Sequence, residues 1–389
     1  MSDPIHIVDA TMFWSATGGG VRRYLLTKHA WLGRRPGWRH TIAAPGIEPS
    51  PGMATLPSMP LPGSGGYRLP LRRGAIAREI EALGPDLVEA GDPYRVAWGA
   101  LDAARTRAIP AVAYCHSNLE QLARLAAGRR FGNAAARVAR RYARHVYAGF
   151  DLVLAPSRCM REHLVAWGVE RVACQPLGVD STAFHPSRAS ATWRAEQGLA
   201  ADARVLVYAG RFAAEKHLDV LADAVARLGA PYVLVAIGAG PVPPPAGARV
   251  RIVPFVAGVD ALATALASAD AFVHAGDQET FGLSALEALA CGTPLVVRDA
   301  EGLGERVDAG TGIVVGIGTG AAFADAVAAL FERDQAVMRR AARARAETSD
   351  WERVLPELMH HYRRLLGRDV PMPAPVAASF EATALPTER

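Results

Sequence analysis

Residues 270–297, DAFVHAGDQETFGLSALEALACGTPLVV, are the stretch that decides the fold class. An apolar run ends near His274, a short polar loop holds Glu279, and a helical pattern begins about Gly282. A strand, a loop and a helix in this order, followed by a second apolar run, are typical of a parallel α/β sheet. The first backbone N–H groups of the helix, around Phe281–Leu283, lack partners within the helix and favour an anion in front of them.

The same alternation of short apolar runs and longer helical patterns fills most of the chain. In the first half, the strands that we predict are Ile5–Val8, Thr41–Ala44, Leu87–Ala90, Ala111–Cys115 and Leu152–Ala155. In the second half, they are Val205–Ala209, Tyr232–Ile237, Val250–Val253, Ala271–His274, Leu295–Val297 and Gly312–Val315. Strands that are apolar throughout and are joined by helices indicate parallel sheets buried on both faces. The sequence therefore predicts two doubly wound α/β units.

Changes in composition suggest where these units begin and end. We expect a first domain, a second domain, a C-terminal helix that packs back on the first domain and a disordered Ala/Pro-rich tail, at residues 1–183, 184–350, 351–368 and 369–389. Pro45–Gly66 has the composition of a loop within the first domain, and residues 176–201 have that of the linker between the two domains.

Almost all of the basic residues are arginines, and they are unevenly distributed. Of the 43 basic residues, 41 are arginines, and Lys28 and Lys216 are the only lysines. A pyridoxal-phosphate Schiff base could form only at these two positions. Residues 1–186 carry a net charge of +9 and residues 187–389 one of −4. The positive charge of the first half therefore favours anionic surroundings, such as a nucleotide, a lipid headgroup or a nucleic acid.

The cysteines and the N-terminus bear on the cellular compartment. Cys115, Cys159, Cys174 and Cys291 are spread along the chain, without a CxxC pair or the spacing of zinc ligands, so we expect reduced thiols. The N-terminus has no basic segment followed by an apolar one, and no window reaches about 18 consecutive apolar residues. We therefore expect a cytoplasmic protein with neither an export signal nor a membrane span.

Glu279 and Glu287 lie eight residues apart, on either side of the predicted helix start. Such a spacing also arises by chance, and this chain has two further pairs, Glu81/Glu89 and Glu162/Glu170. Only the pair at 279 and 287 lies in a strand, loop and helix that ends in the small residues Ala290–Pro294. This block resembles the Glu-x7-Glu block of the retaining glycosyltransferases of family GT4.

The resemblance implies a GT-B fold, in which two Rossmann-like domains hold a nucleotide-sugar donor in the cleft between them. It implies that Glu279 binds hydroxyls of the transferred sugar and Glu287 those of the ribose. It also implies that the helix start, at Phe281, Gly282 and Leu283, contacts the donor diphosphate. The family needs no metal or other cofactor, and the sequence has no Asp-x-Asp motif of the kind that holds a divalent ion in the other major glycosyltransferase fold.

A second basic element follows the strand at 205–209, in the stretch VLVYAGRFAAEK. Arg211 and Lys216 stand five residues apart across a strand-to-helix turn, where a guanidinium and an ammonium can converge on one anionic group. A solvated pair of cations at a helix start is the alternative. The element resembles the Gly-Arg…Lys element with which the GT4 family binds the donor diphosphate, which implies a catalytic role for Arg211 and Lys216. Lys28 is assigned no role.

Two features of the first half match the family more weakly. Gly18-Gly19-Gly20 follows the first strand and opens a helix, which lets a backbone approach a phosphate, although a flexible loop has the same composition. His116 comes directly after a strand, at the sheet edge where open α/β sheets bind ligands, although a structural histidine is the alternative. By resemblance, Gly19 and Gly20 face the donor, and His116 contacts the transferred sugar as a catalytic residue.

Gly238-Ala239-Gly240 is a fragment of a competing motif, the dinucleotide-binding fingerprint. Its third glycine is missing, and Pro241, followed by three more prolines at 243–245, prevents a normal helix start. A dehydrogenase of the Rossmann type is therefore not expected.

Arginines follow one face of the helical pattern that ends near Phe150, at Arg137, Arg140, Arg141 and Arg144. The opposite stripe is apolar, with Val138, Tyr142 and Val146. Such a basic stripe can bind an anionic membrane surface, and a solvated arginine-rich face is the alternative. No nucleic-acid-binding motif accompanies the charge, so we expect no nucleic-acid partner.

These features together predict a retaining glycosyltransferase that moves a hexose from a nucleotide sugar to a hydroxyl of a glycan or a lipid-linked acceptor. GDP-mannose is the expected donor, and UDP-glucose or another UDP-hexose is the alternative. We expect a cytoplasmic enzyme, for which the basic stripe leaves open a peripheral association with the inner face of the cytoplasmic membrane. Two alternatives of other classes are a GT-B epimerase acting on a UDP-sugar and a non-catalytic sugar-nucleotide-binding protein.

Overall fold

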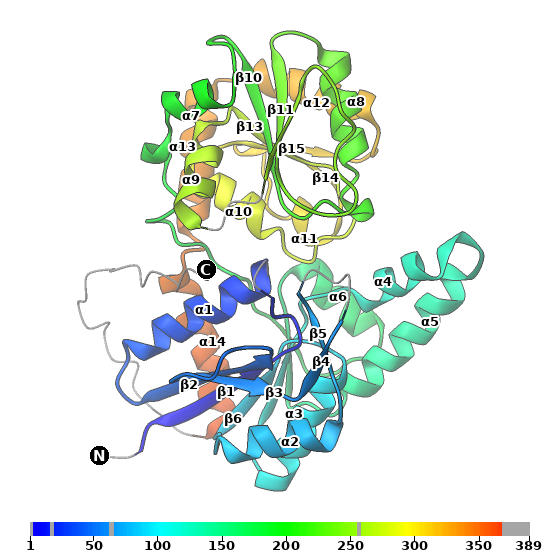
Figure 1. Ribbon diagram of the computed structural model, residues 1–389, viewed down its shortest axis with the longest axis vertical. Coiled ribbons are helices and arrows are strands. Elements are labelled where there is room, and N and C mark those ends of the chain that lie inside the picture. Colours follow the sequence, from blue (N-terminus) through cyan, green and yellow to red (C-terminus); the bar gives the residue numbers. More distant parts are fainter. Residues whose placement is uncertain (1–2, 16–18, 62–65, 255–257, 368–389) are drawn as a thin grey trace.

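The computed structural model describes residues 3–15, 19–61, 66–254 and 258–367. They form two α/β units, drawn in blue to green below and in green to orange above in Figure 1. The predicted tail at 369–389 and Gly18 lie outside the described residues. None of the described helices is long and apolar enough to span a membrane.

The first unit contains a parallel sheet of seven strands in the order β3-β2-β1-β6-β7-β8-β9. Its strands are β1 (Ile5–Ala10), β2 (Trp38–Pro45), β3 (Met53–Leu56), β6 (Leu87–Ala90), β7 (Ala111–Tyr114), β8 (Leu152–Ala155) and β9 (Val172–Cys174). The helices of this unit are α1 (Gly20–Gly33), α2 (Arg73–Ala82), α3 (Arg95–Arg107), α4 (Leu119–Ala126), α5 (Gly128–Tyr147) and α6 (Arg158–Ala166).

The second unit contains a parallel sheet of six strands in the order β12-β11-β10-β13-β14-β15. Its strands are β10 (Arg204–Ala209), β11 (Tyr232–Gly238), β12 (Val250–Pro254), β13 (Ala271–His274), β14 (Leu295–Arg298) and β15 (Gly312–Val315). The helices are η1 (Pro186–Arg188), α7 (Ala191–Glu196), η2 (Ala214–Lys216), α8 (Leu218–Leu228), α9 (Val259–Ser268), α10 (Leu283–Ala290), α11 (Glu301–Gly304), α12 (Gly320–Phe331) and α13 (Gln335–Glu347).

The eleven predicted strands are all present, which confirms the two doubly wound units. The prediction of a plain loop at Pro45–Gly66 is wrong, because β3 pairs with β2 there and β4 (Ser58–Pro60) pairs with β5 (Arg68–Pro70). Short edge strands bury little apolar surface and tolerate proline, so they leave no apolar run in the sequence.

The stretch at 176–201 is not a plain linker either, because it contains η1 and α7. The hydroxyl of Ser190 accepts the N–H of Trp193 and caps α7 at its N-terminus. The limits of the domains stay predictions.

The chain passes between the two units twice, and the two crossing segments are hydrogen-bonded to each other. The N–H of Val179 donates to the carbonyl of Ser349 (3.0 Å), and the N–H of Trp351 donates to the carbonyl of Val179 (3.1 Å). A Cβ at Gly178 would meet the Trp351 ring at 2.7 Å, so the close approach of the segments requires glycine there. Both crossings therefore lie at one point.

The last helix, α14 (Trp351–Leu366), returns to the first unit, where it lies beside α1 in Figure 1. Glu352 near its start accepts hydrogen bonds from the indole of Trp31 (2.9 Å) and from Arg35 (2.8 Å). Tyr362 in its last third accepts a hydrogen bond from Lys28 of α1 (2.7 Å). Helix α14 is thus bound to α1 at two levels.

Lys28, to which no role was assigned above, is fully buried within an ionic cluster. Its ammonium lies 2.8 Å from Asp9 of β1 and 3.3 Å from Glu89 of β6. Burial alone would raise the pKa of Asp9, but Lys28 and His40 outweigh it and hold this pKa at about 2. Burial raises the pKa of Glu89 to about 7. Lys28 and Asp9 therefore form the charged pair.

We expect Lys28→Met to lower the free energy of unfolding by about 3–5 kcal/mol, because the buried carboxylate of Asp9 loses its main counter-charge. Urea unfolding followed by circular dichroism measures this change. The control is Arg227→Met, which removes an exposed ion pair with Asp223 and should change the free energy by less than about 1 kcal/mol. Equal unfolding midpoints for the two variants would contradict a stabilising role of the cluster.

Candidate active site

The strand order places a ligand-binding edge in each sheet. In the first sheet the chain runs outward from β1 to β3 and then returns to β6 on the other side of β1. In the second it runs from β10 to β12 and returns to β13 on the other side of β10. At such switch points the loops that follow the two central strands diverge and leave room for a ligand. Lys216 follows β10, and Glu279 follows β13.

The structure brings Lys216 and Glu279 together. The ammonium of Lys216 lies 2.7 Å from Oε2 of Glu279 and donates to the carbonyl of Gln278 (3.2 Å). Burial opposes ionisation of Glu279, but Lys216, His274 and the amide of Gly282 outweigh it, so the pKa of Glu279 lies below its ordinary value. A cation and an ionised carboxylate thus share the edge of the second sheet.

Arg211, the other predicted cation, binds a different carboxylate. Its guanidinium pairs with Glu215 (2.7 Å), and its side chain is 67% exposed. The turn that carries Arg211 rests on the glycines of the rejected fingerprint, because a Cβ on Gly238 or Gly240 would collide with the backbone of this turn. These two glycines therefore allow the loop that follows β10 to pack closely against them.

The helix start at 281–283 has the expected geometry. Gly282 adopts a left-handed conformation (φ 84°) as the N-cap of α10, and the helix begins at Leu283. Phe281 is buried, with the guanidinium of Arg306 over its ring at 4.4 Å. The side chain of Phe281 thus belongs to the core, and only the backbone of this segment is placed to meet an anion.

The predicted glycines of the first unit meet this helix start from the other side. Gly19 is the N-cap of α1, and Gly20 is its first residue. A Cβ on Gly20 would lie 3.3 Å from Leu283, so the starts of α1 and α10 approach each other closely. Arg23, one turn into α1, forms an ion pair with Glu287 of α10. The predicted ribose-binding carboxylate therefore already bridges the two units.

His116 follows β7 at the carboxyl edge of the first sheet, and its ring stacks on that of Tyr114, with 4.3 Å between the ring centroids. Burial lowers the pKa of His116 to about 3, so the imidazole is neutral at pH 7. Its carbonyl accepts a hydrogen bond from the Thr280 hydroxyl of the second unit (3.1 Å). His116 therefore lies close to the loop that carries Glu279.

Among the residues that the sequence analysis missed and that join the two units are Arg23, Asn118 and Glu301. Asn118 donates to a carboxylate oxygen of Glu301, and the other oxygen of that carboxylate accepts the N–H of Glu279 (3.0 Å). A cation one turn after a glycine-rich helix start is a signal that points to Arg23. No local signal marks Asn118 or Glu301, because their pairing spans 183 residues.

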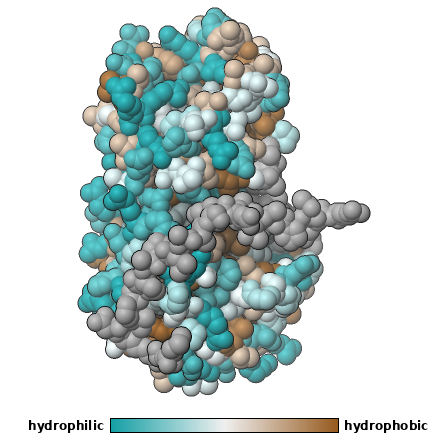
Figure 2. All heavy atoms as spheres, turned by 90° about the vertical axis from the view of Figure 1, so that its left-hand side faces the viewer, coloured by the Kyte–Doolittle hydropathy of each residue, from teal (hydrophilic) through white to brown (hydrophobic). Residues whose placement is uncertain are grey.

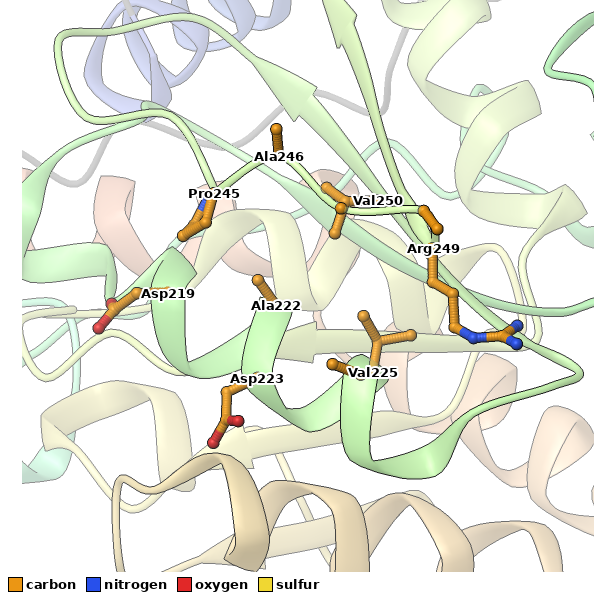
Figure 3. Close-up of a pocket in the computed structure, with 11 residues that line it drawn as sticks. Asp219, Ala222, Asp223, Val225, Pro245, Ala246, Arg249 and Val250 are labelled. Atoms are coloured by element: carbon orange, nitrogen blue, oxygen red, sulfur yellow. The ribbon is translucent and has the colours of Figure 1, made fainter.

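None of the predicted site residues lines either of the two described cavities. One, of about 480 Å³, lies between α8 and the segment Pro245–Val250, with Asp219 and Arg249 at opposite ends of it (Figure 3). The other, of about 300 Å³, lies between the two units near Arg158 and Glu305. In the described part of the chain, no three His, Cys, Asp or Glu side chains cluster as metal ligands would.

Two Rossmann-like units whose switch-point loops meet, with a cation, carboxylates and a helix start between them, define the architecture of a GT-B glycosyltransferase. Residues 203–333 match the family model described as "Glycosyl transferases group 1", and residues 18–183 match "Glycosyltransferase Family 4". The chain belongs to the group 1 glycosyltransferases of family 4.

Two curated relatives cover most of the chain. The GDP-mannose-dependent alpha-(1-6)-phosphatidylinositol dimannoside mannosyltransferase of Mycobacterium tuberculosis is 34% identical over 318 residues, which are 78% of this chain and 80% of that protein. The GDP-mannose-dependent alpha-mannosyltransferase of Mycolicibacterium smegmatis is 33% identical over 319 residues, which are 80% of this chain and 82% of that protein.

Solved structures agree on the fold. Sucrose-phosphate synthase from Thermosynechococcus elongatus superimposes with a TM-score of 0.76 at 21% identity and covers 93% of this chain and 99% of its own. HepE from Anabaena, in complex with UDP and glucose, gives 0.72 at 18% identity and covers 92% and 98%. The predicted GT-B fold and the predicted glycosyltransferase class are confirmed.

The individual site residues stay predictions, which substitution tests directly. We expect Lys216→Ala and Glu279→Ala each to lower turnover of the nucleotide-sugar donor at least about tenfold, or roughly 1.4 kcal/mol of transition-state stabilisation. Glu81→Ala and Glu162→Ala, from the chance pairs, should leave turnover nearly unchanged. Release of nucleoside diphosphate measures all four variants. Equal losses in both sets would remove the basis for the Glu-x7-Glu assignment.

Proposed function

We propose that this enzyme transfers a mannosyl residue from GDP-mannose to a hydroxyl group of a glycolipid, with retention of configuration at the anomeric carbon. The observation that carries the donor assignment is the likeness to the two mycobacterial enzymes, both named as GDP-mannose-dependent, over about four fifths of the chain. One of them is named for a phosphatidylinositol dimannoside, which supports a glycolipid as the acceptor.

In the proposed reaction, the bond between the anomeric carbon and the donor phosphate oxygen breaks, and a bond to the acceptor oxygen forms on the same face of the sugar. The acceptor hydroxyl gives its proton to the departing phosphate oxygen, so the products are GDP and a mannoside. Negative charge develops on the diphosphate, where Lys216 and the amides at the start of α10 stabilise it. Arg211 lies on an exposed turn, from which its side chain swings toward the diphosphate.

The remaining residues bind the sugar and the ribose. Glu279 is ionised and accepts hydrogen bonds from sugar hydroxyls, while the neutral imidazole of His116 binds a hydroxyl without adding charge. Glu287 binds the ribose hydroxyls, for which it releases Arg23. Gly19 and Gly20 let the backbone of α1 approach the donor. No metal or other cofactor takes part, and water is excluded when the two domains close on the donor.

A panel of donors separates this proposal from its alternatives. We expect GDP release from GDP-mannose that depends on added membrane lipid extract, and little release from UDP-glucose or other UDP-hexoses. A UDP-hexose transferase would reverse this preference. An epimerase would convert a UDP-sugar without any acceptor, and a binding protein would release no nucleotide from any donor. Thin-layer analysis of the labelled sugar, combined with detection of nucleoside diphosphate, distinguishes these outcomes.

For the membrane, we propose that the α4–α5 hairpin binds anionic lipid at the inner face of the cytoplasmic membrane. The hairpin extends from the side of the first unit (Figure 1). Near its turn at Ala127–Gly128, Leu125 and Phe131 are 51% and 61% exposed. Apolar side chains near the turn, followed by arginines further along α5, are the arrangement expected of a helix pair that binds at a lipid interface.

The predicted apolar stripe of α5 needs correction, because Val138 is 68% exposed. Small residues and Val146 form the buried face instead, at Ala136, Ala139 and Ala143. Arg137, Arg141 and Arg144 are exposed, whereas Arg140 pairs with Glu120 (3.1 Å). In the proposal, Val138 therefore adds to the apolar surface that faces lipid. The side of the molecule that lies to the left in Figure 1, away from the hairpin, is the face that Figure 2 draws. Its coloured atoms are largely hydrophilic, with scattered hydrophobic residues.

A variant in which Glu replaces Arg137, Arg140, Arg141 and Arg144 should no longer co-sediment with vesicles of anionic phospholipid. The electrostatic attraction between α5 and the anionic headgroups becomes repulsion in this variant. The control reverses the same number of charges at exposed arginines elsewhere, namely Arg78, Arg227, Arg251 and Arg340, and should keep most of the binding. Unchanged binding of the first variant, or equal loss in both, would show that the hairpin is not the specific contact.

A further inference from the structure

Glu301 has a backbone conformation that residues with a side chain rarely adopt. It stands at φ 45°, in the left-handed region, as the first residue of the short helix α11, which follows β14. The two other residues of this kind in the described chain, Ala108 and His217, each follow the last residue of a helix, where a left-handed residue is common, and His217 also directly precedes α8. Glu301 instead begins one. Such strain persists only where surrounding contacts hold the residue in place.

The contacts of Glu301 hold the loop that carries Glu279. Its Oε2 accepts the N–H of Glu279 (3.0 Å), and the next residue, Gly302, donates its N–H to the carbonyl of Glu279 (3.1 Å). A Cβ on Gly302 would collide with the carbonyl of Thr280, so the two loops touch along their backbones. Burial raises the pKa of Glu301 above its ordinary value, and the hydrogen bonds from Asn118 and from the Glu279 amide offset only part of this rise.

The other oxygen of the same carboxylate reaches the first unit. Oε1 accepts a hydrogen bond from the side-chain amide of Asn118, two residues after His116. Asn118 is fixed in turn, because its own oxygen accepts the N–H of Gln121 and caps α4. The carboxylate therefore lies between the loop of His116 and the loop of Glu279. Of the two loops, the first belongs to the acceptor-side domain and the second to the donor site.

We propose that Glu301 is an interdomain latch, a positioning residue that orients the Glu279 loop when Asn118 of the first domain docks on it. One carboxylate then couples closure of the domains to the arrangement of the sugar-binding residues. Glu301 need not touch the donor for this role. The role of Glu279 within it rests on the function proposed above.

The first experiment separates the latch from a merely structural role. Glu301→Gly removes the carboxylate and relieves the left-handed strain, so the melting temperature should stay level or rise. The value of kcat with GDP-mannose should fall at least tenfold, and the affinity for GDP should change less than twofold. Ala108→Gly, which relieves similar strain at the end of α3, should leave kcat unchanged. A large fall in melting temperature for Glu301→Gly, or an unchanged kcat, would overturn the proposal.

The second experiment reverses the polarity of the latch. Asn118→Asp keeps the α4 cap but brings a second carboxylate next to that of Glu301, so the two repel each other. Glu301→Gln brings a second side-chain amide next to that of Asn118, so one hydrogen-bond acceptor of the carboxylate is replaced by a donor. Each should lower kcat at least fivefold. In the double variant, Gln at 301 donates to Asp at 118 and still accepts the N–H of Glu279, so kcat should return to within twofold of the parent. A double variant no better than the worse single variant would contradict the latch.

A readout without any donor keeps this test independent of the proposed donor. Hydrogen exchange of the Glu279 amide should be faster in both single variants than in the parent and should slow again in the double variant. If the exchange follows this pattern while the parent turns over no GDP-mannose, the latch stands and the donor assignment fails. If the parent is active and the exchange does not change, the latch fails.

Discussion

The arrangement of the first unit depends on a fully buried lysine. The side chain of Lys28 is fully buried, and its ammonium lies against Asp9, Tyr362 and Glu89. These partners come from three elements, β1, α14 and β6, so the cost of burying one charge fixes how these elements and α1 pack together. Glu89, with its raised pKa, takes up a proton more readily than the neighbouring carboxylate, which keeps the cluster near neutrality.

The position of α1 in turn sets the contacts between the two units. The start of this helix carries Gly20, which touches Leu283, and Arg23, which pairs with Glu287. A second set of contacts runs from the loop after β7 to the loops after β13 and β14. The switch points of both sheets are thus joined directly, by residues of both units.

Much of the fold could be predicted because its central strands are buried on both faces and leave unbroken apolar runs, as in Val205–Ala209. The edge strands β3 and β9 were missed because three or four half-buried residues leave no such run. For the candidate site, Lys216 and Glu279 could be proposed from the sequence because each lies in a short stretch with its own strand and helix start. The pairings of Arg23 with Glu287 and of Asn118 with Glu301 join residues far apart in the chain. Only the packing of one unit on the other creates them.

The hydrogen-bonded crossing at Val179 and Trp351 has a topological consequence. The second unit leaves and re-enters the rest of the protein at the same point, so it is an insertion whose two ends already lie side by side. A segment of this kind can be exchanged for another of similar span without moving the strands and helices that receive it. The fold therefore allows recombination to replace the second unit while the first unit and its returning helix stay intact.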